Sequence, residues 1–172
     1  MDFKSARLEI KSLDDTGQFV GMAAVYNNVD LGGDLIEGGA FGKSLLDRGA
    51  TTPLLWNHDT GEPIGVGRLT ETHGGLQVEG KLIFDDNPAA RRTYALMKGG
   101  AITGLSIGFE TLRQVMQGSV RHLKELRLFE VSLCAIPMNP LATVASVKTL
   151  PDHREELAAI NQLRQTIRKA MR

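Results

Sequence analysis

The sequence is poor in several residue types, and each shortage excludes a class of protein. Only one of its 172 residues is a cysteine, Cys134, so the chain has no internal disulfide framework and no cysteine-histidine cluster with zinc spacing. Neither sign of charge is in excess, because 20 basic residues stand against 20 acidic ones. This balance argues against a general electrostatic grip on nucleic acid or on an anionic membrane. A protein or a small molecule is the expected partner.

Long apolar runs are also missing. No stretch approaches the roughly 18 apolar residues of a membrane-spanning helix. Residues 1–10 are charged and lack the apolar region of a secretory signal. We therefore expect a soluble protein that starts out in the cytoplasm. With 42% hydrophobic residues, the chain suffices for one domain with a genuine core.

What the sequence does contain is a series of short alternating stretches separated by turn residues. The expected order is a strand with its loop, a short helix, two strands joined by a turn, another strand and a second helix, over residues 19–36, 37–50, 51–71, 74–84 and 85–100. In the second helix, Asn87 fits the N-cap, Pro88 the first turn and Gly99 the exit.

Residues 101–110, AITGLSIGFE, contain the G-x-S-x-G pattern of hydrolase nucleophile elbows, with Ser106 at its centre. In an alternating strand, Ser106 shares a face with Gly104 and Gly108, so a substrate backbone can approach it closely. The alternative is that these glycines mark a bulge or close sheet packing, and that Ser106 only forms a local hydrogen bond.

The elbow context is absent after Ser106. An elbow continues into a helix, followed by an acid and then a histidine. Residues 110–136 instead predict two strands joined at residues 117–119. The downstream histidines are weak candidates for a base, since His122 reads as a surface residue of a strand and His153 as a helix-terminal residue. An elbow-type esterase is therefore a disfavoured alternative.

His58 is the better candidate for a general base. It follows the apolar stretch PLLWN, so a buried strand delivers its imidazole into a turn where it stays accessible. Histidine titrates near neutral pH and can take a hydroxyl proton and return it to a leaving amine. A structural histidine in this turn is an equal alternative.

Glu130 is the anomaly in an otherwise apolar strand, and a buried carboxylate needs a partner. That partner is either His58, as in a catalytic triad, or an arginine such as Arg68 or Arg113 in a structural ion pair. Ser132 shares the face of Glu130 and is a fallback nucleophile without the glycine clearance of Ser106.

Four segments, AAVYNNVDLGGDLIEGGAF, LLWNHD, GLSIGF and FEVSLCAIPMNPLATV, resemble in order and spacing the tailed-phage prohead (capsid maturation) serine protease family, itself similar in fold to the herpesvirus assemblins. The resemblance covers residues 19–147 and implies a small mixed or antiparallel β-barrel surrounded by helices. It also implies a protease inside the assembling prohead, in the host cytoplasm, that cuts the scaffolding segment from the major capsid protein and finally cuts itself. No metal or organic cofactor is expected.

Carried over residue by residue, the resemblance places the catalytic serine at Ser106, the histidine at His58 and the third member at Glu130, where the assemblins have a second histidine. Gly104 and Gly108 are expected to leave room for the substrate. The assemblins have an arginine in the loop after the strand of the third member, but CAIPMNP contains none, so the oxyanion donors are left unassigned and backbone N–H groups are expected to contribute. Assemblins act as dimers, which implies self-association. A noncatalytic barrel that binds capsid or scaffold is the main alternative.

Residues 148–172 form a predicted helical tail beyond a barrel domain of residues 1–147. Apolar side chains recur there near helical spacing, at Leu157, Ile160, Leu163, Ile167 and Met171. We expect this amphipathic helix to pack on the barrel or to pair with another subunit. By analogy with the family, docking on the scaffold or removal by self-cleavage are the alternatives.

Overall fold

The structure is a computed structural model and describes residues 16–146. Its elements, in chain order, are β1 (Gln18–Val25), β2 (Asp34–Ile36), α1 (Gly42–Arg48), β3 (Thr51–Trp56), β4 (Pro63–Thr72), β5 (Gly75–Leu82), α2 (Pro88–Lys98), β6 (Gly104–Gln117), β7 (Val120–Cys134) and β8 (Val144–Ser146). The predicted tail helix of residues 148–172 lies outside the described residues, so the division of the chain at residue 147 stays a prediction.

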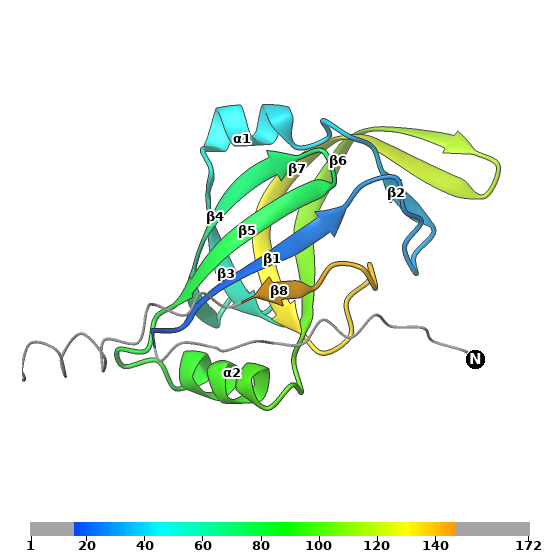
Figure 1. The fold of residues 1–172 in the computed structure, drawn as a ribbon. Coiled ribbons are helices and arrows are strands. Elements are labelled where there is room, and N and C mark those ends of the chain that lie inside the picture. Colours follow the sequence, from blue (N-terminus) through cyan, green and yellow to red (C-terminus); the bar gives the residue numbers. More distant parts are fainter. Residues whose placement is uncertain (1–15, 147–172) are drawn as a thin grey trace, which may run out of the picture.

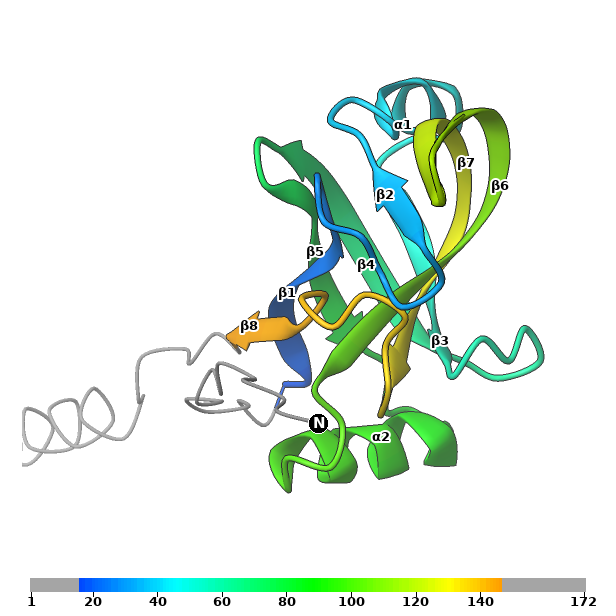
Figure 2. The ribbon, with the colours of Figure 1, turned by 90° about the vertical axis from the view of Figure 1, so that its right-hand side faces the viewer.

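One mixed sheet curls on itself to form a barrel (Figure 1, Figure 2). Its strands follow the order β2-β7-β3-β4-β5-β1-β8, and β6 pairs with β7. Strands β2 and β3 run parallel to β7, whereas the other pairs are antiparallel. Backbone hydrogen bonds from Leu105 N to Ala142 O and from Val144 N to Thr103 O join β6 to the segment entering β8. The expected mixed β-barrel with surrounding helices is confirmed.

The two helices lie at opposite ends of the barrel (Figure 1). In α2, the Asn87 side chain accepts a hydrogen bond from Ala90 N, and Pro88 occupies the first turn, as the sequence predicts. Ala90, Thr93 and Met97 of α2 are buried, so this helix covers one end of the core. Neither helix of residues 16–146 is long and apolar enough to cross a membrane.

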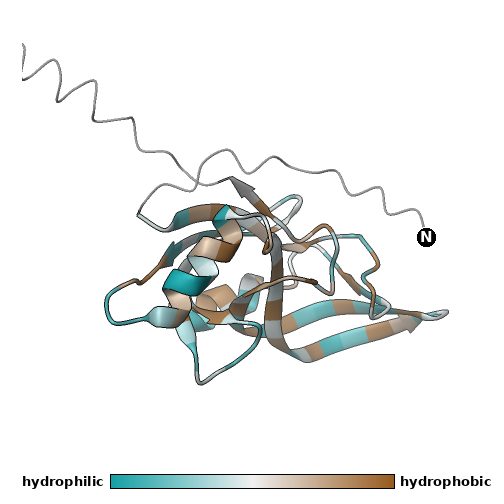
Figure 3. Ribbon diagram, turned by 90° about the horizontal axis from the view of Figure 1, so that it is seen from below, coloured by the Kyte–Doolittle hydropathy of each residue, from teal (hydrophilic) through white to brown (hydrophobic). Residues whose placement is uncertain are grey.

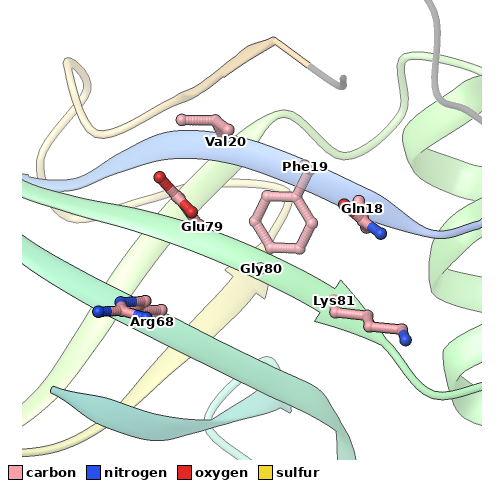
Figure 4. Close-up of a pocket in the computed structure, with 7 residues that line it drawn as sticks. All are labelled: Gln18, Phe19, Val20, Arg68, Glu79, Gly80 and Lys81. Carbon is pink, nitrogen blue, oxygen red and sulfur yellow. The ribbon is translucent and has the colours of Figure 1, made fainter. Parts of the chain in front are cut away.

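Alternation along β5 builds one wall of the core. Leu76, Val78 and Leu82 are buried, while the intervening charged side chains face solvent. Phe19 of β1 lies across Gly80 at this wall, and a Cβ on Gly80 would lie 2.2 Å from the Phe19 Cζ atom. A cavity of about 230 Å³ lies beside them, and Figure 4 shows the residues of β1, β4 and β5 that line it. None of the residues that line this cavity belongs to the candidate site described below.

The far half of the β6–β7 hairpin projects beyond the barrel as an arm (Figure 1). Figure 3 shows hydrophilic and hydrophobic residues alternating along it, and Leu112, Val115 and Met116 are among its exposed side chains. The two strands and their junction at residues 117–119 agree with the prediction. Because Ser106 lies within a continuous strand, no nucleophile elbow is formed.

Side chains of β2 and of the residue after it contact β7 close to the turn of the arm. Arg121 forms a two-pronged ion pair with Asp34, with 2.6 Å between Arg121 Nε and Asp34 Oδ1. His122 Nδ1 lies 3.0 Å from Glu37 Oε1, and this contact holds the pKa of Glu37 below its usual value. His122, which the sequence indicates as a surface residue, is thus a half-buried partner of Glu37.

Candidate active site

Three neighbouring strands carry the predicted site, with β7 in the middle. In the parallel β3–β7 ladder, Leu55 lies opposite Ser132, and in the antiparallel β6–β7 ladder Ser106 lies opposite the same Ser132. Gly108 lies opposite Glu130. Directly opposed residues of an antiparallel pair, and residues two apart along one strand, point to the same face of a sheet. Ser106, Glu130 and Ser132 therefore share one face.

His58 reaches this face from the end of β3. Asn57 N donates to Leu133 O at 3.1 Å, which extends the β3–β7 ladder by one bond. Asn57 and His58 then both adopt left-handed backbone angles, with φ of 49° and 64°. This conformation is uncommon for residues other than glycine, and it clusters at functional sites where the surroundings enforce it. It turns the chain back over β7.

The imidazole of His58 pairs with the buried carboxylate. His58 Nδ1 lies 2.6 Å from Glu130 Oε1, and the Glu130 side chain is 8% exposed against 44% for that of His58. The sequence left open whether Glu130 pairs with a histidine or an arginine. The structure gives it His58, whereas Arg113 lies 3.9 Å from Glu125. A carboxylate on Nδ1 fixes the imidazole tautomer and stabilises a charged ring.

Ser106 lies on the same face and is 9% exposed. Between residues 16 and 146, no hydrogen bond joins the Ser106 hydroxyl to His58. Because Glu130 occupies Nδ1, the nitrogen that remains for a hydroxyl is Nε2. Contacts between a nucleophile and its base are often long in unliganded enzymes and tighten only with substrate. The face thus holds a hydroxyl, an imidazole and a carboxylate, the groups of acyl-transfer chemistry.

The two glycines beside Ser106 are surrounded by the chain's own atoms. A Cβ on Gly108 would lie 2.3 Å from Glu130 Oε1, and one on Gly104 would lie 2.6 Å from Pro137 Cδ. From the sequence, we expected the space left by the missing side chains of these glycines to be occupied by the substrate. In the structure the clearance at Gly108 admits the Glu130 carboxylate, and that at Gly104 admits the proline ring. Substrate contact at these positions stays a prediction.

Cys134 ends β7 four residues after Glu130 and is buried. Burial and the nearby Glu130 carboxylate raise the pKa of the Cys134 thiol to about 11. The thiolate is the reactive form of cysteine, and it is scarce at neutral pH when the pKa is this high. Cys134 is therefore a packing residue of this site and not a competing nucleophile.

Sequence reasoning missed the contacts of Ser132. Its hydroxyl donates to Glu130 Oε2 at 2.7 Å and accepts from His58 N at 2.9 Å. The only signal in the sequence is its place two residues after Glu130, on the same strand face. The link to His58 depends on the parallel pairing of β3 with β7, which joins segments more than 70 residues apart along the chain.

The chain is similar to two curated phage proteins. It is 34% identical over 151 residues to the prohead protease of Enterobacteria phage HK97, and 31% identical over 163 residues to the capsid polyprotein of Pseudomonas phage PAJU2. These matches cover 83% and 89% of this chain. They cover 66% and 23% of the two relatives, so the chain spans less than two thirds of the length of either.

Among solved structures, the bacteriophage T4 capsid assembly protease matches with a TM-score of 0.52 at 15% identity, over 67% of this chain and 80% of that chain. At this identity the likeness concerns the fold alone. The profile of the family described as caudovirus prohead serine protease matches residues 6–156, which is most of the chain. By this match, the chain belongs to the caudovirus prohead serine protease family.

Proposed function

We propose that this chain is a serine endopeptidase in which Ser106 is the nucleophile, His58 the general base and Glu130 the residue that orients and stabilises the imidazole. One observation carries the proposal: His58 Nδ1 lies 2.6 Å from a buried carboxylate, on the sheet face that also holds Ser106. Membership of a serine protease family supports the same chemistry.

In the proposed reaction, His58 Nε2 takes the proton of the Ser106 hydroxyl as Oγ bonds to the carbon of the scissile peptide. Glu130 stabilises the imidazolium, which then gives its proton to the leaving amine as the peptide C–N bond breaks. Water hydrolyses the resulting ester by the same route and restores the Ser106 hydroxyl. Backbone N–H groups are the expected oxyanion donors, and no metal is required.

The proposed substrate is the scaffolding segment of the major capsid protein, cut inside the assembling prohead in the host cytoplasm. Support comes from the names of the relatives, a prohead protease and a capsid polyprotein. We further propose that the chain cuts itself once assembly is complete and that it acts as a homodimer.

The test is coexpression of the full chain with its cognate major capsid protein. We expect the capsid protein to be shortened at one defined site, and Ser106→Ala to abolish this cleavage while leaving the chain folded. Ser119→Ala is the matched control, because Ser119 is an exposed serine in the turn of the arm. It should cleave at the unchanged rate. Unchanged cleavage by Ser106→Ala would reject Ser106 as the nucleophile.

A noncatalytic barrel that binds capsid or scaffold is the rival function. It predicts that the wild-type chain copurifies with the capsid protein and leaves it intact. The pairing of His58 with a buried carboxylate disfavours this rival, because a binding surface has no need to bury a charged group beneath an accessible imidazole.

A further inference from the structure

The Ser132 hydroxyl is fully buried between the two partners of the candidate site. It donates its one proton to Glu130 Oε2 at 2.7 Å and accepts the backbone N–H of His58 at 2.9 Å. It therefore links the carboxylate that holds the imidazole to the backbone that carries the imidazole. No substrate atom can reach it in this structure, which leaves it unsuited to be the nucleophile.

The backbone at His58 needs such a link. Asn57 and His58 are consecutive residues with left-handed φ angles, a conformation that persists only where surrounding contacts impose it. The hydrogen bond to Ser132 Oγ is made by the His58 peptide itself. Without it, the turn after β3 keeps the hydrogen bond from Asn57 N to Leu133 O but loses the one that the His58 peptide makes to β7.

Glu130 needs the same hydroxyl. Its two carboxylate oxygens have one partner each, His58 Nδ1 on Oε1 and Ser132 Oγ on Oε2. Gly108 leaves space for Oε1 on the neighbouring strand. The hydrogen bond to Oε2 therefore prevents rotation of the carboxylate and stabilises its charged form.

We propose that Ser132 is a positioning residue that fixes the His58 imidazole and the Glu130 carboxylate in one rigid unit. Its effect on catalysis rests on the proposed function above, whereas its effect on the His58–Glu130 pair does not. Losing the Ser132 hydroxyl should therefore free the carboxylate to rotate and loosen its hydrogen bond to His58.

The first experiment is NMR spectroscopy of the His58 imidazole in the full chain carrying Ser106→Ala, which prevents self-cleavage. His58→Ala assigns the resonance among those of the four histidines. We expect Ser132→Ala to shift the hydrogen-bonded Nδ1–H resonance of His58 upfield and to speed its exchange with water, because the bond to Glu130 is no longer held in one geometry. An unchanged resonance and exchange rate in a folded Ser132→Ala protein would overturn the proposal.

The second experiment measures cleavage of the purified capsid protein by chains with an intact Ser106. We expect Ser132→Ala to lower kcat about tenfold to hundredfold, because a displacement of about 1 Å of a catalytic group can cost about a hundredfold in rate, with little change in KM. Ser132→Thr keeps the hydroxyl and should retain most of the activity. A change in KM alone would contradict a positioning role. If Ser106→Ala still cleaves, the proposed function fails, and the NMR measurement of the His58–Glu130 hydrogen bond still decides the role of Ser132.

Discussion

At the scale of single residues, Gly108 sets the space available to the buried carboxylate. A Cβ there would lie 2.3 Å from Glu130 Oε1 and 2.9 Å from its Cγ, so Gly108→Ala must displace the Glu130 side chain. A displacement of about 1 Å of a catalytic group can lower the rate about a hundredfold. We therefore expect Gly108→Ala to lower the rate of capsid cleavage by this order, measured on folded protein.

The control for this substitution is Gly74→Ala. Gly74 lies in the exposed turn between β4 and β5, and a Cβ there would meet no atom within 4 Å. It makes the same chemical change without touching the site, so cleavage should stay at the wild-type rate. Full activity of a folded Gly108→Ala protein would mean that Glu130 tolerates movement, and its orienting role would be wrong.

The sequence predicted the chemical character of the site better than its contacts. Glu130 stands out as a charge in an apolar strand, and His58 as a histidine at the end of another, because each breaks a local pattern. Ser132 breaks no pattern, since a serine fits either face of a strand. Its two hydrogen bonds, and the use of Gly108 to admit a carboxylate, follow from strand register, which a single sequence does not encode locally.

At the scale of elements, α2 braces the turn that carries His58. Arg92 of α2 lies 3.3 Å from Glu62 in this turn and stacks over Trp56, the last residue of β3. Asn87 caps the helix and also donates from Nδ2 to Pro63 O at 2.8 Å. The cap therefore fixes both the start of α2 and the first residue of β4.

We expect Asn87→Ala to lower the free energy of unfolding by about 1 kcal/mol, the usual cost of losing a helix N-cap. Urea unfolding followed by circular dichroism measures it. Asn87→Ser keeps a side-chain acceptor suited to the N-cap and removes the amide donor to Pro63 without placing a charged oxygen against its carbonyl, so it should lie closer to the wild type. If the alanine and serine variants are equally unstable, the cap contributes little and the bond to Pro63 dominates.

Local elements were predictable because each carries its own signals: alternation for β5, a cap and a terminal glycine for α2, and a tight turn between β6 and β7. Their arrangement was not. The parallel pairing of β3 with β7, on which the site depends, joins strands far apart in the chain and leaves no trace in either strand. The resemblance to a known family supplied the barrel that periodicity alone does not determine.

At the scale of the whole molecule, the stability of the fold depends on pH in the alkaline range, because a buried phenol and a buried thiol have raised pKa values. Burial and the adjoining Glu71 raise the pKa of the Tyr26 phenol above its usual value. Burial and Glu130 raise that of the Cys134 thiol. Both groups must lose their protons at a higher pH in the folded chain than in the unfolded chain. The folded barrel is therefore favoured below the unfolded pKa values and loses stability above them.

Cys134→Ala isolates the contribution of the thiol. Its pKa rises from 9.0 to about 11 on folding, so between these values the unfolded chain releases a proton that the folded chain keeps. Because proton release favours the unfolded chain, the free energy of unfolding falls by about 3 kcal/mol as pH rises through this range, at roughly 1.4 kcal/mol per pH unit. Urea unfolding of both proteins from neutral pH to pH 11 should show a steeper alkaline fall for the wild type than for Cys134→Ala. Because Tyr26 is present in both, parallel curves would mean that folding does not raise the pKa of the Cys134 thiol.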